Sequence, residues 1–157
     1  MAQEYRRGGQ RVLFHPAHRT LGEQSEGVGS ATGLAKILVV DDDIAIAKSL
    51  CIRLKSAGYT IDTANDGVSA TQKAIQGKPD LIILDLSMPA GDGHSVLARL
   101  RENPETMLTP ILVLTASQRP GLREEVLAAG ATVFFEKPFE SWDLLQTIER
   151  ELGIGPK

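Results

Sequence analysis

A run of four apolar residues, Leu81 to Leu84, that ends in Asp85 places the strongest constraint on the fold of this 157-residue chain. Consecutive apolar residues predict a strand that is buried on both faces, as in a parallel sheet covered by helices. A carboxylate that follows such a strand avoids the core only at the rim of the sheet. In an open α/β sheet, ligands bind outside the carboxyl ends of the strands. Asp85 is therefore a candidate functional residue.

Three further segments share this pattern of an apolar strand that ends at a polar or charged residue: Ile37–Val40 before Asp41 and Asp42, Ile111–Leu114 before Thr115, and Thr132–Glu136 before Lys137. With a strand at residues 59–64 and helical periodicity between the runs, strand and helix alternate five times. This alternation predicts a doubly wound α/β fold, with a parallel sheet of five strands and helices on both faces. Right-handed crossovers then bring all the carboxyl ends to one edge.

The first helical segment follows the aspartates after residue 40. Ile46, Leu50 and Leu54 recur every four residues with lysine and arginine between them, which predicts an amphipathic helix that buries these three side chains. Gly58 supplies its end.

The amino-terminal residues 1–35 differ from the rest of the chain. They contain six of the fifteen glycines and few periodic apolar residues, which predicts a flexible extension. It is interpreted either as an inert extension, or a start codon placed too early, or as a docking arm that uses Arg6, Arg7, Arg11 and the apolar run Val12-Leu13-Phe14. Order is expected over residues 36–153, and residues 154–157 form a short tail.

Composition excludes some classes of function. The net charge of −3 provides no strong electrostatic attraction to nucleic acid, and no apolar run approaches the length that spans a membrane. A single cysteine, Cys51, excludes an intrachain disulfide and suits a reducing cytoplasm, where we expect the protein.

The residues at the predicted sheet edge form a chemically coherent set. Carboxylates held close together repel unless a cation neutralises them, and oxygen ligands suit Mg²⁺. Lys137 adds a positive charge and Thr115 a hydroxyl donor. Together these groups are suited to binding the oxygens of a phosphoryl group, and an aspartate among them can accept that group as an acyl phosphate.

With these residues in place, the chain resembles the response-regulator receiver domains of two-component signalling, of the chemotaxis-regulator type. The resemblance covers about residues 35–153 and is carried by four motifs: Val39-Val40-Asp41-Asp42, Leu84-Asp85-Leu86-Ser87-Met88-Pro89, Leu114-Thr115-Ala116 and Lys137-Pro138-Phe139. The spacings of 30 residues from Asp85 to Thr115 and 22 from Thr115 to Lys137 are typical of that family. It implies a flavodoxin-like sheet with strand order 2-1-3-4-5 and five helices.

The resemblance also implies roles for the acidic residues. Asp85 would be the phosphoacceptor. Asp42, Asp85 and the backbone carbonyl of Ser87 would ligate Mg²⁺, and Asp41 would assist through a water molecule.

The family further implies a switch. Thr115 and Lys137 would contact the phosphoryl oxygens, and the bond before Pro138 would be cis. Phe134, three residues before the lysine, would turn inward behind Thr115. Many relatives have tyrosine there; phenylalanine lacks the hydroxyl, so we expect its coupling to come from packing alone. The readout would be the face formed by the fourth helix, the fifth strand and the fifth helix.

The implied partners follow from this chemistry. A sensor histidine kinase or a histidine phosphotransfer protein would donate the phosphoryl group, and a downstream protein would bind the switched face. About 20 residues follow Lys137, so we expect a stand-alone receiver without catalytic turnover, direct DNA binding or membrane insertion. Homodimers through the switch face are one expectation. Trp142, off the apolar stripe of the last helix, is a candidate partner contact or packs on the chain's own surface.

A second function competes with this interpretation. Asp41-x-Asp43 after an apolar strand resembles the nucleophile motif of haloacid-dehalogenase-type phosphatases, which also need Mg²⁺ and a lysine. That interpretation makes Asp41 the modified residue and leaves Asp85 without a role.

Overall fold

The central sheet of the protein has five parallel strands. The computed structural model describes residues 3–7, 10–14, 35–88 and 92–154, and the chain divides into residues 35–139 and a second unit of residues 1–34 and 140–157. The strands of the first unit are β4 (Lys36–Val40), β5 (Thr60–Ala64), β6 (Leu81–Asp85), β7 (Ile111–Thr115) and β8 (Val133–Glu136). Their order β5-β4-β6-β7-β8 confirms the predicted order 2-1-3-4-5.

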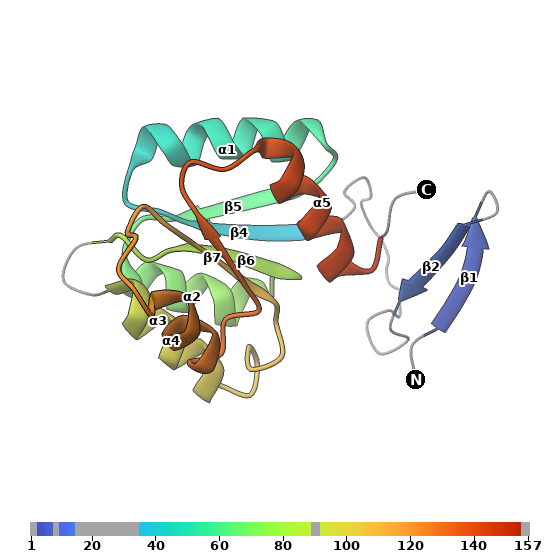
Figure 1. The fold of residues 1–157 in the computed structure, drawn as a ribbon. Coiled ribbons are helices and arrows are strands. Elements are labelled where there is room, and N and C mark those ends of the chain that lie inside the picture. Colours follow the sequence, from blue (N-terminus) through green and yellow to red (C-terminus); the bar gives the residue numbers. More distant parts are fainter. Residues whose placement is uncertain (1–2, 8–9, 15–34, 89–91, 155–157) are drawn as a thin grey trace. The chain divides into compact units, whose positions relative to one another are not determined.

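Helices cover both faces of this sheet (Figure 1). Helix α1 (Ile44–Ser56) lies on one face, and α2 (Gly67–Gly77), α3 (Asp92–Glu102) and α4 (Leu122–Ala128) lie on the other. This arrangement follows from right-handed crossovers between parallel strands, which place helices above and below the sheet. Among the described residues, no helix is long and apolar enough to span a membrane.

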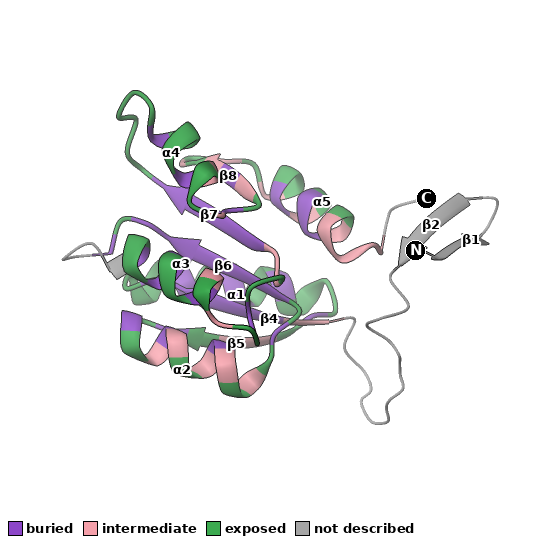
Figure 2. Ribbon diagram, turned by 90° about the horizontal axis from the view of Figure 1, so that it is seen from below, coloured by how far each residue is buried: buried purple, intermediate pink, exposed green. Residues whose placement is uncertain are grey.

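The central strands are buried because helices cover them on both sides. Every residue of β6 and β7 is buried, as Figure 2 shows by their continuous purple. The residues on one side of these strands pack with α2, α3 and α4 in a single apolar cluster that includes Ile82, Val113 and Phe134. Strand β5 lies at the edge of the sheet and is only partly buried.

Aspartate side chains begin the first two helices. The Asp43 carboxylate accepts a hydrogen bond from the Ile46 N–H at 3.1 Å, and Asp66 accepts one from the Ser69 N–H at 2.8 Å. Each bond satisfies one of the N–H groups that have no partner within the first turn of a helix. Both helices therefore start directly after the carboxyl end of a strand.

The buried stripe of α1 differs from the predicted one. Leu50 and Leu54 are buried as expected, but Ile46 is 43% exposed. Ala47 and Cys51 complete the stripe instead. The helix is thus rotated so that small side chains contact the sheet.

The second unit contains one strand pair and one helix among its described residues. Strands β1 (Gln3–Arg7) and β2 (Gln10–Phe14) pair antiparallel, with Arg6 opposite Arg11. Residues 15–34 lie outside the described residues, so the assignment of residues 1–35 as a flexible extension stays a prediction. Helix α5 (Ser141–Leu152) ends at Gly153, which adopts a left-handed conformation with φ of 73°. Residues 155–157 are also outside the description.

Candidate functional site

The sheet brings the polar residues of four strand ends to one edge. Asp41 directly follows β4, Asp85 and Thr115 are the last residues of β6 and β7, and Lys137 directly follows β8. The parallel register places Asp85 opposite Leu114, one residue before Thr115, and Thr115 opposite Glu136, one residue before Lys137. Residues that are far apart in the sequence therefore line a single site.

Asp85 lies at the centre of this site and is only 3% exposed. Its Oδ1 accepts a hydrogen bond from the Ser87 N–H at 2.8 Å, and its Oδ2 accepts one from the Lys137 ammonium at 3.2 Å. Lys137 also lies 3.8 Å from Oδ2 of Asp41. One ammonium group thus faces two buried carboxylates, which leaves the site with an excess of negative charge.

Asp41, the second buried carboxylate, has a raised pKa. It is 3% exposed, and its Oδ1 accepts a hydrogen bond from the Asp43 N–H at 2.8 Å. Burial away from water raises the pKa of Asp41 from its usual 3.8 to about 6, and the negative charge of Asp85 adds to the rise. The Asp43 N–H and the Lys137 ammonium oppose it. Ionisation of Asp41 beside the Asp85 carboxylate therefore costs free energy.

Three carboxylates form a possible cation site. Asp41, Asp42 and Asp85 each offer one oxygen, and these oxygens lie within 4.8 Å of one another. Asp42 is exposed, so the cluster is open to solvent on one side. Hard oxygen donors in a negatively charged, solvent-accessible site fit Mg²⁺, which usually binds one or two carboxylates and retains water molecules.

Ser87 lies between the acidic cluster and the loop after β7. Its N–H donates to Asp85, and its hydroxyl oxygen accepts a hydrogen bond from the Ala116 N–H at 3.5 Å. Its expected use of a backbone carbonyl as a metal ligand stays a prediction. Pro89, the last residue of the motif that contains Asp85, lies outside the described residues.

Thr115 is almost completely buried, with 1% exposed. Its Oγ1 accepts a hydrogen bond from the Ser117 N–H at 3.0 Å. The hydroxyl is therefore engaged with its own loop. Because a hydroxyl both donates and accepts, it can still donate to a group on the acidic side.

Phe134 is buried, with 8% exposed, and belongs to the apolar cluster of the sheet. The guanidinium carbon of Arg123 lies over its ring, 5.9 Å from the centroid. The sequence analysis missed Arg123. The periodicity of α4 shows that this arginine is on the exposed side of the helix, but it does not show that its side chain lies over Phe134 of β8. The peptide bond from Lys137 to Pro138 is cis, as predicted.

Trp142 belongs to α5 and is 66% exposed. This exposure agrees with its position off the apolar stripe, while its role as a partner contact stays a prediction.

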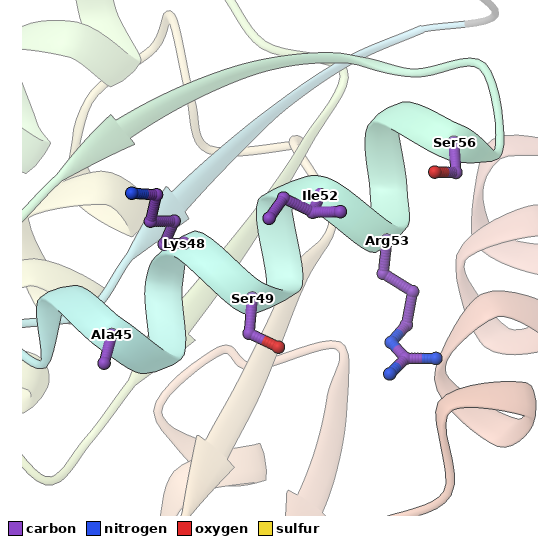
Figure 3. Close-up of a pocket in the computed structure, with 6 residues that line it drawn as sticks. All are labelled: Ala45, Lys48, Ser49, Ile52, Arg53 and Ser56. Carbon is purple, nitrogen blue, oxygen red and sulfur yellow. The ribbon is translucent and has the colours of Figure 1, made fainter.

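A hollow on α1 is distinct from the acidic cluster. Figure 3 shows that its lining comes from the exposed side of this one helix: Ala45, Lys48, Ser49, Ile52, Arg53 and Ser56. Lys48 and Arg53 point in different directions. With no second element among the lining residues, the hollow does not gather groups around a ligand.

Curated proteins of similar sequence are response regulators. The DNA-binding dual master transcriptional regulator RpaA of Synechocystis sp. is 37% identical over 115 residues, which cover 73% of this chain and 48% of that protein. The response regulator MprA of Mycobacterium leprae is 42% identical over 113 residues, which cover 72% of this chain and 49% of MprA. The chain thus spans about half the length of these relatives.

This finding corrects one expectation. We expected no direct DNA binding, because few residues follow the last predicted strand. That expectation is wrong: similar receiver sequences form part of longer regulators, one of them named as DNA-binding. Low net charge described only the receiver part and could not exclude such an output.

Solved structures of similar fold are receiver proteins. The chemotaxis response regulator CheY4 of Vibrio cholerae has a TM-score of 0.69 and 40% identity, over 75% of this chain and 98% of CheY4. The receiver domain of a Pseudomonas aeruginosa sensor histidine kinase, solved with a magnesium ion coordinated in its active site cleft, has a TM-score of 0.70 and 31% identity, over 76% and 98% of the two chains.

A family model agrees with these likenesses. The model of the response regulator receiver domain matches residues 37–149, which contain the five strands of the sheet except for Lys36, the first residue of β4, and every residue of the acidic cluster. The match, the fold and the edge residues agree with one another: the chain belongs to the response regulator receiver domain family of two-component signalling.

Proposed function

We propose that this chain accepts a phosphoryl group on Asp85 from a phosphohistidine of a sensor kinase or a phosphotransfer protein. One observation carries the proposal: Asp85 is a buried carboxylate at the carboxyl edge of the sheet, between the Ser87 N–H at 2.8 Å and the Lys137 ammonium at 3.2 Å. Groups that hold a carboxylate in this way also fix its orientation toward an incoming phosphorus atom.

The transfer exchanges one bond to phosphorus for another. A carboxylate oxygen of Asp85 forms the new bond, and the bond from phosphorus to the imidazole nitrogen breaks. The nitrogen keeps the electron pair of that bond, and Asp85 becomes an acyl phosphate. Lys137, already in contact with Asp85, balances part of the negative charge on the phosphoryl oxygens.

Asp41, Asp42 and Asp85, together with the backbone carbonyl of Ser87, would hold Mg²⁺. When bound, the metal neutralises charge on the carboxylates and on the phosphoryl oxygens. The raised pKa of Asp41, caused first by burial and then by the charge of Asp85, supports this assignment, because a cation bound there would favour the ionised carboxylate.

Thr115 and Phe134 would convert the chemistry into a signal. The Thr115 hydroxyl donates to a phosphoryl oxygen, which draws the start of the loop after β7 toward Asp85. Phe134 occupies the space behind it, and the face that α4 and β8 form presents the change to a partner. A phosphoryl group adds about −1.5 to −2 of charge, which is enough to bias two arrangements of a loop.

The proposal can be tested by intact mass after incubation with acetyl phosphate, with Mg²⁺ or with EDTA. We expect one phosphoryl group on the wild type with Mg²⁺, none on Asp85→Asn, and slower labelling of Asp41→Asn, because loss of Asp41 weakens only the metal site. Asp66→Asn is the matched control: it makes the same change at the start of α2, where asparagine caps a helix as well as aspartate does.

Two outcomes would contradict the proposal. A label that survives Asp85→Asn and requires Asp41 would support the phosphatase-type nucleophile instead. The absence of any label on the wild type, with folding intact, would indicate a receiver that acts without phosphorylation.

A further inference from the structure

The ring of Phe134 is held between the apolar cluster and a cation. One side of the residue packs in the cluster with Val113, Leu122 and Val126. The guanidinium of Arg123, on the first turn of α4, lies over the ring at 5.9 Å from its centroid. This distance is within the range at which a cation is attracted to the face of an aromatic ring.

The first turn of α4, to which Arg123 belongs, starts at Leu122. Gly121 precedes it with φ of 83°, and no side chain caps the helix start. The opposite end is anchored, because Arg101 donates to the Gly130 carbonyl at 2.7 Å. The amino end of α4 therefore lacks a side-chain cap, while its carboxyl end is tied to α3 through Arg101.

Three other titratable side chains near this turn contact one another. Arg119 donates to Glu125 at 2.8 Å, and His94 lies 3.6 Å from the same carboxylate. These contacts join α3, the loop before α4 and α4 at the surface. They do not involve the ring of Phe134, so the two arginines can be distinguished by substitution.

We propose that Arg123 is a positioning residue that keeps Phe134 in its buried position and so ties the first turn of α4 to the phosphorylation site. The inference rests on the proposed function of Phe134. Phenylalanine has no hydroxyl with which to hold a rotamer by hydrogen bonding, and the guanidinium supplies the missing restraint. Burial of the ring is then favoured before phosphorylation, and the phosphorylated state forms from a larger starting population.

The experiment compares Arg123→Met, Arg123→Lys and the control Arg119→Met. Methionine keeps much of the length and apolar contact of the arginine stem but removes the charge, whereas lysine keeps a cation. Ring burial is measured by ¹⁹F NMR of fluorophenylalanine-labelled protein, which has four phenylalanines, with Phe134→Leu used to assign the signal. Affinity for beryllofluoride with Mg²⁺, a phosphoryl analogue, is measured on the same samples.

We expect Arg123→Met to raise the exposed fraction of the Phe134 signal and to weaken beryllofluoride binding by about two- to fivefold, the range of an exposed cation–π contact. Arg123→Lys should lie between Met and the wild type. Arg119→Met should leave both quantities unchanged. Affinity for Mg²⁺ alone should be the same in all variants, a pattern that general loss of stability would not produce.

The two proposals fail in different ways. If the Phe134 signal of Arg123→Met matches that of the wild type, Arg123 does not position the ring, whatever the affinity for beryllofluoride. If the wild type itself binds no beryllofluoride, the phosphoacceptor function fails, while the ring signal still decides the role of Arg123.

Discussion

Asp41 retains its proton to higher pH than an ordinary aspartic acid, because burial and the Asp85 carboxylate disfavour its charge and raise its pKa to about 6. A metal ion must displace that proton to use the carboxylate. We therefore expect the apparent affinity for Mg²⁺ to fall about tenfold between pH 7 and pH 5, the loss expected for one required deprotonation at that pKa. Isothermal titration across this range measures the dependence.

Asp41→Asn is the control for this prediction. The variant should bind Mg²⁺ more weakly at pH 7 but lose less affinity on acidification, because the group that titrates is gone. An identical pH dependence in the wild type and the variant would assign the titration to another residue. The sign for metal-free stability is the reverse: a raised pKa favours the protonated folded state, so this contribution to stability decreases as the pH rises from about 4 to 6.

Sequence reasoning could place residues at strand ends but could not describe their partners. Asp85 was located because four apolar residues before it required a buried strand, and such a strand has only one place for a charge. The contact between Arg123 and Phe134 depends on how α4 is rotated over β8. The spacing of apolar residues in the sequence does not determine that rotation. For the same reason, packing alone was expected to hold Phe134.

The edge strand β5 shows how a single element protects its open side. Both backbone polar groups of Thr63 have side-chain partners. Its N–H donates to Asp62 at 2.9 Å, and its carbonyl accepts from the Lys73 ammonium at 2.6 Å. Lys73 and Asp62 are themselves 3.4 Å apart. An ion pair thus occupies backbone groups that could otherwise pair with another strand.

We expect Lys73→Met to increase self-association, because it frees the Thr63 carbonyl and removes a charge from the sheet edge. Sedimentation velocity over a range of protein concentrations measures the change. Lys48→Met, which removes an exposed lysine from α1, is the matched control and should behave like the wild type. Equal association of the two variants would mean that loss of charge, rather than the open edge, is responsible.

At the scale of elements, the order of strands and helices could be predicted because apolar runs and amphipathic periods alternate without interruption. The rotation of α1 could not. A four-residue spacing fits Ile46 with Leu50 and Leu54, but Ala47 and Cys51 share the same helical face with the two leucines. Ile46 and the pair Ala47 and Cys51 both fit helical spacing with the two leucines. Only packing against the sheet determines that the smaller side chains, Ala47 and Cys51, are buried.

The parallel strands carry different groups at their carboxyl ends and at their amino ends. The carboxyl edge holds the acidic cluster. At the amino ends of β7 and β8, Arg101 donates to the carbonyls of Gly130 at 2.7 Å and of Thr106 and Met107 at 3.1 Å each. This guanidinium connects α3 to the segments that precede two strands, and burial lowers its pKa.

Arg101→Met should lower the free energy of unfolding by about 2 kcal/mol, because it leaves several carbonyl groups without a charged donor. Urea denaturation measures this loss, and Arg99→Met, on the exposed side of the same helix, is the control. Affinity for Mg²⁺ should not change, since the acidic cluster lies at the other ends of the strands. A matching loss of metal affinity would show that the two edges are coupled.

Because the acidic cluster and the Arg101 contacts lie at opposite ends of the strands, a fluorescent reporter can be attached close to one and far from the other. Leu108, 88% exposed, lies in the turn before β7. A fluorophore at Leu108 would record unfolding of the domain yet give no signal during the proposed phosphorylation of Asp85. A fluorophore at Gln118, in the loop after the same strand, would respond to the proposed phosphorylation of Asp85 before any unfolding. Two fluorophores at opposite ends of β7 would therefore distinguish a change at the acidic cluster from unfolding of the domain in one sample.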